Sequence, residues 1–328
     1  MTDLIAVDIG GTHVRFARAA VSDSGAVTLG EVRKLKTDDY VSLQTAWDAY
    51  RGMEGEDLPG ATAIAIAGPV SGGTVRMTNN SWSFHPASLP AQLRVEKLTV
   101  INDFGAVAHA AARAPDGEFL PLSGPEGPLP ATGTISVIGP GTGLGVAHFH
   151  RFTGGYHVQA TEGGHVDFAP VDAIDDAMLL RLRRRHRRVS VERVVSGPGI
   201  VAIHEALAAY EGRPVEEFED TDIWQAGLES RDSLAVAAVD RFCQSLGSVA
   251  GDYALAHGAA GVVIAGGLGL RLRDVLPSSG FAERFRFKGR YEQMMAGLPV
   301  KLITLAEPGL YGAAAAFAAE HCDMPVTR

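Results

Sequence analysis

Residues 4–12 read Leu4-Ile5-Ala6-Val7-Asp8-Ile9-Gly10-Gly11-Thr12, an apolar run that carries one carboxylate and ends in two glycines and a threonine. An extended-looking segment, residues 13–17, follows at once. This pattern predicts two strands joined by a tight turn, because no helical pattern begins directly after the glycines. Glycines let a ligand approach the backbone closely, and successive amide groups in such a turn can bind an anion. The turn is therefore a candidate phosphate site.

A similar pattern recurs near the middle of the chain. Residues 135–138 run into Gly139-Pro140-Gly141-Thr142-Gly143, and an apolar segment again follows. Two such turns favour a clamp on a polyphosphate, whereas a single turn is as typical of a structural hairpin, with Asp8 capping the first. The candidate cofactor-binding residues are Val7, Asp8, Ile9, Gly10, Gly11 and Thr12 at the first turn, and Gly141, Thr142 and Gly143 at the second. The chain has no Gly-Lys-Ser/Thr loop, no G-x-G-x-x-G motif and no protein-kinase motif pair.

Composition and charge exclude several classes of function. The 328 residues carry 29 Lys and Arg against 38 Asp and Glu, a net charge of −9, which disfavours sequence-independent binding to nucleic acid. Cys243 and Cys322 are too few for a disulfide framework or a structural zinc site, which suits a reducing cytoplasm. Asp3 and Asp8 interrupt the first apolar run, so it does not resemble a signal peptide. The Gly and Pro content of residues 127–147 argues against a membrane helix.

Apolar runs of strand length are interspersed with helical patterns, which predicts an α/β protein with largely buried sheets. The expected strands cover residues 4–9, 61–67, 98–101, 134–138, 261–265 and 300–305. The expected helices cover residues 41–51, 104–113, 173–188, 200–210, 234–256 and 310–320. Residues 115–133 are rich in Pro and Gly and lack periodicity, so we expect them to connect two domains.

Two short polar segments carry candidate catalytic chemistry. In Ile101-Asn102-Asp103-Phe104, Asp103 stands where a strand should end and a helix begin, either as a general base or as an ordinary helix cap. Asn102 offers both a donor and an acceptor to a hydroxyl group. In Glu162-Gly163-Gly164-His165, the glycines keep side chains away from a carboxylate and an imidazole, which favours recognition of a polyol over half of a metal site.

Three further features each have two interpretations. Glu192 comes shortly before Ser196-Gly197-Pro198-Gly199, which is a ligand segment or simply the start of a helix. Ala265-Gly266-Gly267 ends an expected strand, where bare backbone suits either a purine ring or close packing. A basic run marks an anionic effector or partner surface or, as we favour, a solvated helix face with salt bridges. Its arginines are Arg181, Arg183, Arg184, Arg185, Arg187 and Arg188.

Together these motifs resemble the bacterial glucokinase family, the hexokinase-type group that lacks the cysteine-rich zinc motif of the ROK sugar kinases. The similar segments keep their order along nearly the whole chain, and residues 162–168 are the most specific of them. The segments are residues 8–12, 65–69, 77–82, 101–104, 139–145, 162–170, 190–199, 265–267 and 308–310.

The resemblance implies an α/β, actin-like or hexokinase-type (ribonuclease H-like) ATPase fold, with two α/β domains around a deep cleft. The implied small domain covers residues 1–113 plus 305–328, and the large domain covers residues 114–304. The implied reaction is the ATP-dependent phosphorylation of D-glucose to glucose 6-phosphate at the entry to glycolysis, with ATP and Mg²⁺ as cofactors. Asp103 would be the catalytic base and Asp8 would lie near the metal. The implied substrate ligands are Asn79, Asn102, Asp103, Glu162, His165 and Glu192, with Gly266 and Gly267 added to the cofactor site.

Three positions depart from the family's usual pattern, and none is an implied sugar ligand. His13 replaces a common Asn, Gly68 replaces a common Cys, and His85 replaces a common Ser. The rival interpretations are a kinase of the same fold for another hexose such as N-acetylmannosamine or fructose, a non-catalytic sugar-sensing regulator, and a phosphatase or ATPase. ADP and polyphosphate stay open as alternative phosphoryl donors. The expected partners are glucose, ATP and a second copy of the chain in a cytoplasmic homodimer, with neither nucleic acid nor membrane.

Overall fold

The structure is a computed structural model that describes residues 1–55, 57–68, 70, 73–77, 82–215 and 217–322. Its contacts divide the chain into two compact units. The first unit contains Met1–Pro115, Arg151–Ala160 and Leu305–Arg328, and the second contains Asp116–His150 and Thr161–Thr304. The domain boundaries expected from the sequence differ mainly in assigning residues 151–160 to the large domain, and they stay a prediction.

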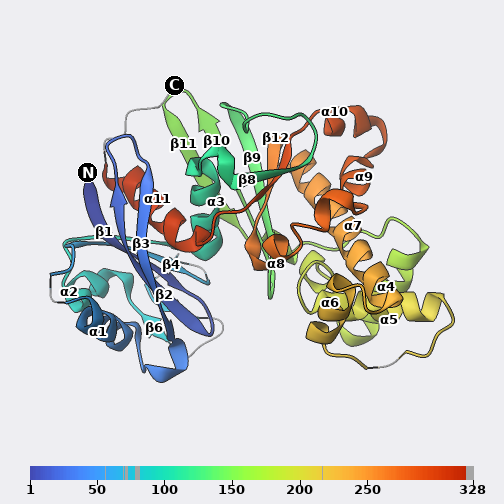
Figure 1. The fold of residues 1–328 in the computed structure, drawn as a ribbon, viewed down its shortest axis with the longest axis horizontal. Coiled ribbons are helices and arrows are strands. Elements are labelled where there is room, and N and C mark those ends of the chain that lie inside the picture. Colours follow the sequence, from blue (N-terminus) through green and yellow to red (C-terminus); the bar gives the residue numbers. More distant parts are fainter. Residues whose placement is uncertain (56, 69, 71–72, 78–81, 216, 323–328) are drawn as a thin grey trace. The chain divides into compact units, whose positions relative to one another are not determined.

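A five-stranded sheet of order β3-β2-β1-β4-β7 forms the centre of the first unit (Figure 1). Its strands are β1 (Thr2–Ile9), β2 (His13–Val21), β3 (Val27–Lys36), β4 (Ala61–Ile66) and β7 (Lys97–Asn102). The first three strands are antiparallel neighbours, while β4 lies parallel to both β1 and β7. The carboxyl ends of β1, β4 and β7 therefore meet at one sheet edge, which is where open α/β sheets bind ligands.

Helices cover both faces of this sheet, so β1 is buried on both sides and reads as a nearly continuous apolar run. The odd-numbered side chains from Ile5 to Ile9 pack with α1 (Leu43–Glu54). Leu4 and Ala6, which point to the opposite face, pack with α11 (Pro308–His321). Helix α11 also packs closely on α3 (Asp103–Arg113), since a Cβ atom at Gly312 would overlap the carbonyl oxygen of Ala106. The short elements β5 (Val75–Arg76), β6 (Ser83–Phe84) and α2 (Leu89–Leu93) complete the described part of this unit.

A second sheet of six strands has the order β11-β10-β9-β12-β13-β8. Strand β12 lies parallel to β9 and β13, and β8 is an antiparallel edge strand beside β13. The strands are β8 (Phe119–Ser123), β9 (Gly133–Pro140), β10 (Leu144–Phe152), β11 (Gly155–Thr161), β12 (Ala259–Ile264) and β13 (Val300–Ile303). The residues of the β10–β11 hairpin from 151 to 160 group with the first unit.

Helices of the second unit share one large apolar core with this sheet, and α7 packs directly on β9 and β12. They are α4 (Ala173–Arg185), α5 (Gly199–Tyr210), α6 (Asp220–Leu228), α7 (Ser233–Ala256), α8 (Gly266–Arg271), α9 (Phe281–Arg286) and α10 (Glu292–Ala296). No helix of the described chain combines the length and the apolarity needed to cross a bilayer.

An ionic cluster that is buried except at Asp172 holds the start of α4. The N-cap residue Asp172 accepts 2.7 Å hydrogen bonds from Arg241 of α7 and Arg284 of α9. Asp175, which is 2% exposed, contacts the same two guanidinium groups at 3.4 and 3.2 Å. The negative charges of the two carboxylates are compensated by the positive charges of the two guanidinium groups, as buried charges require. The N-terminal end of α4 is therefore held firmly against two other helices.

The α/β class predicted from the sequence is confirmed, and each glycine turn joins two neighbouring strands, as predicted. Two expectations about secondary structure were wrong. Residues 115–133 are not only a connection, because they contain β8, whose edge position tolerates Pro121 in place of a hydrogen-bonding residue. The helix expected at residues 173–188 ends at Arg185, because His186 adopts an extended conformation, so Arg187 and Arg188 lie outside α4.

Candidate active site

The first glycine turn, residues 10–12, connects β1 to β2 in the first unit. The Gly10 amide donates to the carbonyl of His13 at 2.9 Å. The buried Thr37 holds the turn from outside, because its hydroxyl donates to the carbonyl of Gly11 at 2.8 Å and its amide donates to the carbonyl of Thr12 at 3.0 Å. The predicted turn is therefore a well-anchored loop at the carboxyl end of β1.

Asp8 lies near the end of β1 and pairs with Arg15 on the neighbouring strand, with 2.9 Å between the carboxylate and the guanidinium group. Burial raises the pKa of Asp8 above its ordinary value, and the charge of Arg15 opposes that shift. Gly309 of α11 packs on the carboxylate, since a Cβ atom there would lie 2.8 Å from its Cγ. The salt bridge to Arg15, rather than a cap on the turn, is thus the main polar contact of Asp8.

Asp8 also bears on the expected magnesium ion. The described residues hold no group of three or more His, Cys, Asp or Glu side chains that could bind a metal. Mg²⁺ is, however, commonly held by one or two carboxylates together with substrate phosphates and water. The single carboxylate of Asp8 beside a glycine turn fits an ion of that kind, and does not fit a site made of protein ligands alone.

Asn102 and Asp103 stand where β7 passes into α3, at the same sheet edge as the first turn. Asn102 is the cap of α3, because its Oδ1 accepts from the amides of Phe104 at 2.9 Å and Gly105 at 3.0 Å. Its Nδ2 donates to the carbonyl of Gly68 at 3.2 Å. Asp103 is the first helical residue, and its Oδ1 accepts from the amide of Phe104 at 2.8 Å. The capping role considered for Asp103 therefore belongs to Asn102.

The second glycine turn lies beside Glu192 in the second unit. One carboxylate oxygen of Glu192 accepts from the amide of Leu144 at 2.9 Å. The same oxygen would lie 2.5 Å from a Cβ atom at Gly143, so only glycine fits there without a shift of the carboxylate. The amide of Gly197 donates to the carbonyl of Gly141 at 2.7 Å. The structure thus joins Glu192 and the segment that follows it to the second turn.

Glu162 is the N-cap residue of the 3₁₀ helix η4 (Gly163–His165), and His165 is its last residue. Their side chains are 75% and 59% exposed, and His165 Nε2 lies 4.0 Å from Glu162 Oε2. The two glycines allow close packing on β10, whereas their expected role of leaving room for a ligand stays a prediction. A Cβ atom at Gly164 would overlap the carbonyl oxygen of Leu144, and one at Gly163 would lie 2.8 Å from Val146.

Gly266 and Gly267 begin α8, shortly after the end of β12. Of the two roles considered for them, Gly266 supports close packing and Gly267 is compatible with room for a purine ring. Gly266 has a φ of +79°, and a Cβ atom there would lie 2.6 Å from the carbonyl oxygen of Pro140, so this glycine serves close packing against the second turn. Gly267 has no neighbouring atom within 4 Å of a built Cβ, which leaves open space beside its backbone.

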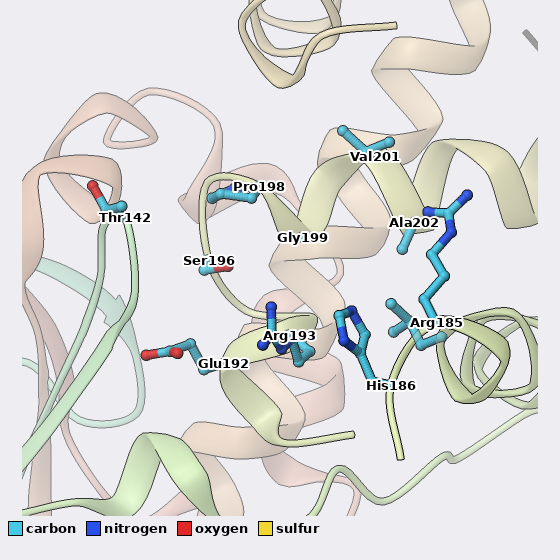
Figure 2. Close-up of a pocket in the computed structure, with 11 residues that line it drawn as sticks. Thr142, Arg185, His186, Glu192, Arg193, Ser196, Pro198, Gly199, Val201 and Ala202 are labelled. Carbon is cyan, nitrogen blue, oxygen red and sulfur yellow. The ribbon is translucent and has the colours of Figure 1, made fainter. Parts of the chain in front are cut away.

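A pocket of about 180 Å³ adjoins the second turn within the second unit. Figure 2 shows Thr142 and Glu192 on one side, His186 and Arg185 on the other, and Arg193 and Ser196 between them. Sequence reasoning missed the lining residues His186, Arg193 and Ser196. The available signal was the position of Arg193 and Ser196 in the segment that follows Glu192, for which the sequence left a ligand segment and the start of a helix as open interpretations.

The predicted residues fall into two groups, each within one unit. Asp8, the first turn, Asn102 and Asp103 meet at one sheet edge of the first unit. Glu162, His165, Glu192, the second turn and Gly266 lie in connected segments of the second unit. Asn79 lies outside the described residues.

Comparisons with known proteins agree with one another. The family model described as Glucokinase matches residues 5–320. A glucokinase of Zymomonas mobilis is 52% identical over 322 residues, which cover 98% of this chain and 99% of that protein. The crystal structure of a glucokinase from an Antarctic psychrotroph is similar with a TM-score of 0.87 and 34% identity, covering 97% of this chain and 99% of the other. A ROK family glucokinase from Streptomyces griseus, solved in complex with glucose and AMPPNP, shares the fold with a TM-score of 0.62 at 20% identity, covering 95% and 98% of the two chains. The actin-like, hexokinase-type fold predicted from the sequence is confirmed.

Proposed function

The chain belongs to the glucokinase family, as the sequence motifs indicated, and from that premise we propose that it transfers the γ-phosphoryl group of ATP to the 6-hydroxyl of D-glucose. The product would be glucose 6-phosphate, formed at the entry to glycolysis. One observation carries the proposal of mechanism: Asn102 caps α3, so the neighbouring carboxylate of Asp103 is not needed for that purpose.

Asp103 is the proposed general base. The amide of Phe104 holds one of its carboxylate oxygens at 2.8 Å, which orients the group at the carboxyl edge of the sheet. A base so placed would accept the proton of the sugar hydroxyl as that oxygen attacks the phosphorus atom. Phosphoryl transfer depends mainly on positioning and charge stabilisation, so one oriented carboxylate is chemically sufficient as the base.

Asn79, Asn102, Glu162, His165 and Glu192 are the other proposed sugar ligands. Asn102 has both lone pairs of its Oδ1 engaged by amides, so it would offer the sugar its remaining Nδ2 hydrogen as a donor. Glu192 uses one oxygen to hold the amide of Leu144, and its carboxylate would also accept from a sugar hydroxyl. A site of this kind distinguishes sugars by the polar groups that a missing or inverted hydroxyl would leave unpaired.

The two glycine turns are the proposed phosphate ligands. The pocket beside Thr142 supports this, because Arg193 lines it and brings positive charge close to the second turn. The open backbone at Gly267 would accept the base of the nucleotide, and Gly266 would shape the entry to it. A magnesium ion bound with the donor would neutralise charge on the phosphate oxygens, and Asp8 would hold it directly or through water.

We also propose that residues 1–113 plus 305–328 and residues 114–304 act as two domains, each supplying part of the ligand set. We further propose that the protein is a cytoplasmic homodimer without a nucleic-acid partner. The net charge of −9 supports the absence of nucleic-acid binding.

A coupled assay of the purified protein against a panel of sugars and donors tests the proposed function. Each unpaired polar group costs about 1–3 kcal/mol, so kcat/KM for glucose should exceed that for galactose and fructose by roughly tenfold or more. ATP should outperform ADP and polyphosphate. Equal turnover of the three sugars would instead indicate a broad hexokinase, and rapid ATP hydrolysis without sugar would indicate an ATPase.

A further inference from the structure

The basic run of residues 181–188 is the densest positive charge in this acidic chain, and the proposed reaction does not account for it. Part of the run is a salt-bridged helix face, because Arg181 and Arg185 contact Glu205 of α5 at 3.9 and 2.8 Å. Arg183, Arg184 and Arg187 are exposed, and their side chains have no hydrogen bond or ion pair within the described part of the chain.

Arg188 differs from the other arginines of the run because it contacts the segment that carries two of the proposed sugar ligands. Its guanidinium group donates to the carbonyl of His165 at 2.7 Å and to the carboxylate of Asp167 at 2.9 Å. Backbone hydrogen bonds run alongside, from Val191 to Val166 at 2.9 Å and from Phe168 to Val189 at 3.1 Å. Arg188 thus fastens the segment after Glu162 to the segment that leads into Glu192.

We propose that Arg188 is a positioning residue for the sugar site, acting through the backbone of His165 rather than on the sugar. The inference rests on the proposed function. The side chains of Glu162 and His165 are 75% and 59% exposed, so packing does little to hold them. Two consecutive glycines also leave the intervening backbone conformationally free unless contacts restrain it. The direction of both ligands therefore depends on the points at which the turn is tied.

Three such ties are present. Tyr253 donates its hydroxyl to the carbonyl of Gly163 at 2.5 Å, and Gly164 packs against the carbonyl of Leu144. Arg188 provides the third tie, at the ligand residue His165 itself. Two features restrain the position of Arg188. Helix α4, which precedes it, is anchored at Asp172 and Asp175, and the residues after Arg188 pair with residues 166–168. Removing Arg188 would leave the turn held at the glycines and by the backbone hydrogen bonds of Val166 and Phe168, without the hydrogen bond to the carbonyl of His165.

The alternative is that Arg188 forms an ordinary surface ion pair, since its side chain and that of Asp167 are 59% and 71% exposed. Exposed pairs of this kind commonly contribute almost nothing measurable. The two interpretations differ in what a substitution changes. A surface pair predicts no specific effect on sugar binding, whereas a positioning role predicts a higher glucose KM with little change in kcat or in the KM of the donor.

Kinetics of Arg188→Gln beside Arg187→Gln separates these interpretations. Both variants remove one exposed positive charge, but the side chain of Arg187, the neighbouring residue, makes no hydrogen bond or ion pair with the described residues. Loss of the two hydrogen bonds should raise the glucose KM of Arg188→Gln by roughly three- to tenfold, with the donor KM and kcat within about twofold of the parent. Arg187→Gln should match the parent, and Arg188→Lys should recover part of the loss because an ammonium group can still donate to one acceptor. A glucose KM for Arg188→Gln equal to that of Arg187→Gln overturns the proposal.

Amide hydrogen exchange gives a readout that does not depend on catalysis. The amides of Val166 and Phe168 should exchange roughly three- to tenfold faster in Arg188→Gln than in the parent, and should be unchanged in Arg187→Gln, because local opening sets exchange. Unchanged exchange in Arg188→Gln would contradict the positioning role. If the parent protein phosphorylates no sugar at all, the proposed function fails, and the exchange rates still decide whether Arg188 holds the turn.

Discussion

At the first glycine turn a buried threonine holds the backbone, while at the second turn a carboxylate does so. Thr37 donates its hydroxyl to the carbonyl of Gly11 and has no proposed contact with the sugar. Glu192 accepts from the amide of Leu144, touches Gly143, and is also a proposed sugar ligand. The two turns have similar sequences, but substitutions in them should therefore have different effects on substrate binding. Changes at the first turn should affect the phosphoryl donor alone, whereas changes at the second should affect donor and sugar together.

The largest effect is expected for Glu192→Ala, which removes the anchor of the second turn and a sugar ligand at once. An unpaired amide at Leu144 and an unpaired sugar hydroxyl each cost about 1–3 kcal/mol, so kcat/KM for glucose should fall by roughly 10²- to 10³-fold. The KM of the donor should rise as well. Steady-state kinetics with each substrate varied in turn measures both effects.

Glu192→Gln is the matched control for that experiment, because its amide oxygen can still accept from Leu144 while the charge is lost. It should recover most of the donor KM and less of the glucose KM. If Glu192→Ala raises the glucose KM but leaves the donor KM unchanged, the second turn is not linked to the sugar site through this carboxylate.

Asp103→Asn is expected to have the next largest effect, and Asp103 lies outside both glycine turns. The amide keeps the shape of the side chain but accepts a proton poorly, so kcat should fall by roughly 10²-fold while the KM values change much less. Pre-steady-state and steady-state rates with saturating glucose and ATP test this. Retention of more than about a tenth of the parent kcat would remove Asp103 as the base.

Gly143→Ala and Gly141→Ala sharpen the difference within the second turn itself. A Cβ atom at Gly143 would lie 2.5 Å from the Glu192 carboxylate and displace it, whereas one at Gly141 would meet nothing within 4 Å. Gly143→Ala should therefore lower kcat/KM for glucose by roughly tenfold, as expected when a proposed ligand is misplaced. Gly141→Ala should leave the glucose KM within about twofold of the parent. Equal glucose KM values for the two variants would argue against the role given to Glu192.

The smallest effect is expected for Thr37→Val at the first turn. The substitution keeps the side-chain volume and leaves the carbonyl of Gly11 without its 2.8 Å partner. It should lower the free energy of unfolding by about 1 kcal/mol and raise the donor KM by less than about fivefold. The glucose KM should not change. A rise in the glucose KM as large as that of the donor would mean that the two turns do not differ as described.

The main features of the fold were accessible from the sequence because local patterns specify them. Apolar runs that end in Gly and Thr were enough to predict both hairpin turns, and helix periodicity located α3, α5, α7 and α11 closely. Strands β3 and β11 were missed because both are half-exposed and lack an apolar run: β3 carries charged residues, and β11 carries polar residues and a glycine. Strand β8 was missed because an edge position tolerates the Pro and Gly that usually indicate a loop.

The contacts within the site were less accessible, because residues far apart in sequence form them. Asn102 and Asp103 are both capping residue types, and only the backbone conformation shows that Asn102 takes the cap. The sequence around Gly163 and Gly164 does not indicate that both glycines pack against β10. The hydrogen bonds from the Leu144 amide to Glu192 and from Arg188 to the His165 carbonyl span 48 and 23 positions, so no local pattern could reveal them.

The place of α11 has a consequence for the order in which the protein can be made. This helix covers one face of the first sheet and packs on α3, yet about 195 positions separate the end of α3 from its start. At a ribosome speed of roughly 5–20 residues per second, on the order of 10 to 40 s pass between the synthesis of α3 and that of α11. Until then, Leu4, Ala6 and the neighbouring side chains lack the helix that covers them. During that interval the nascent chain presents an uncovered apolar sheet face, which is a natural binding surface for a chaperone.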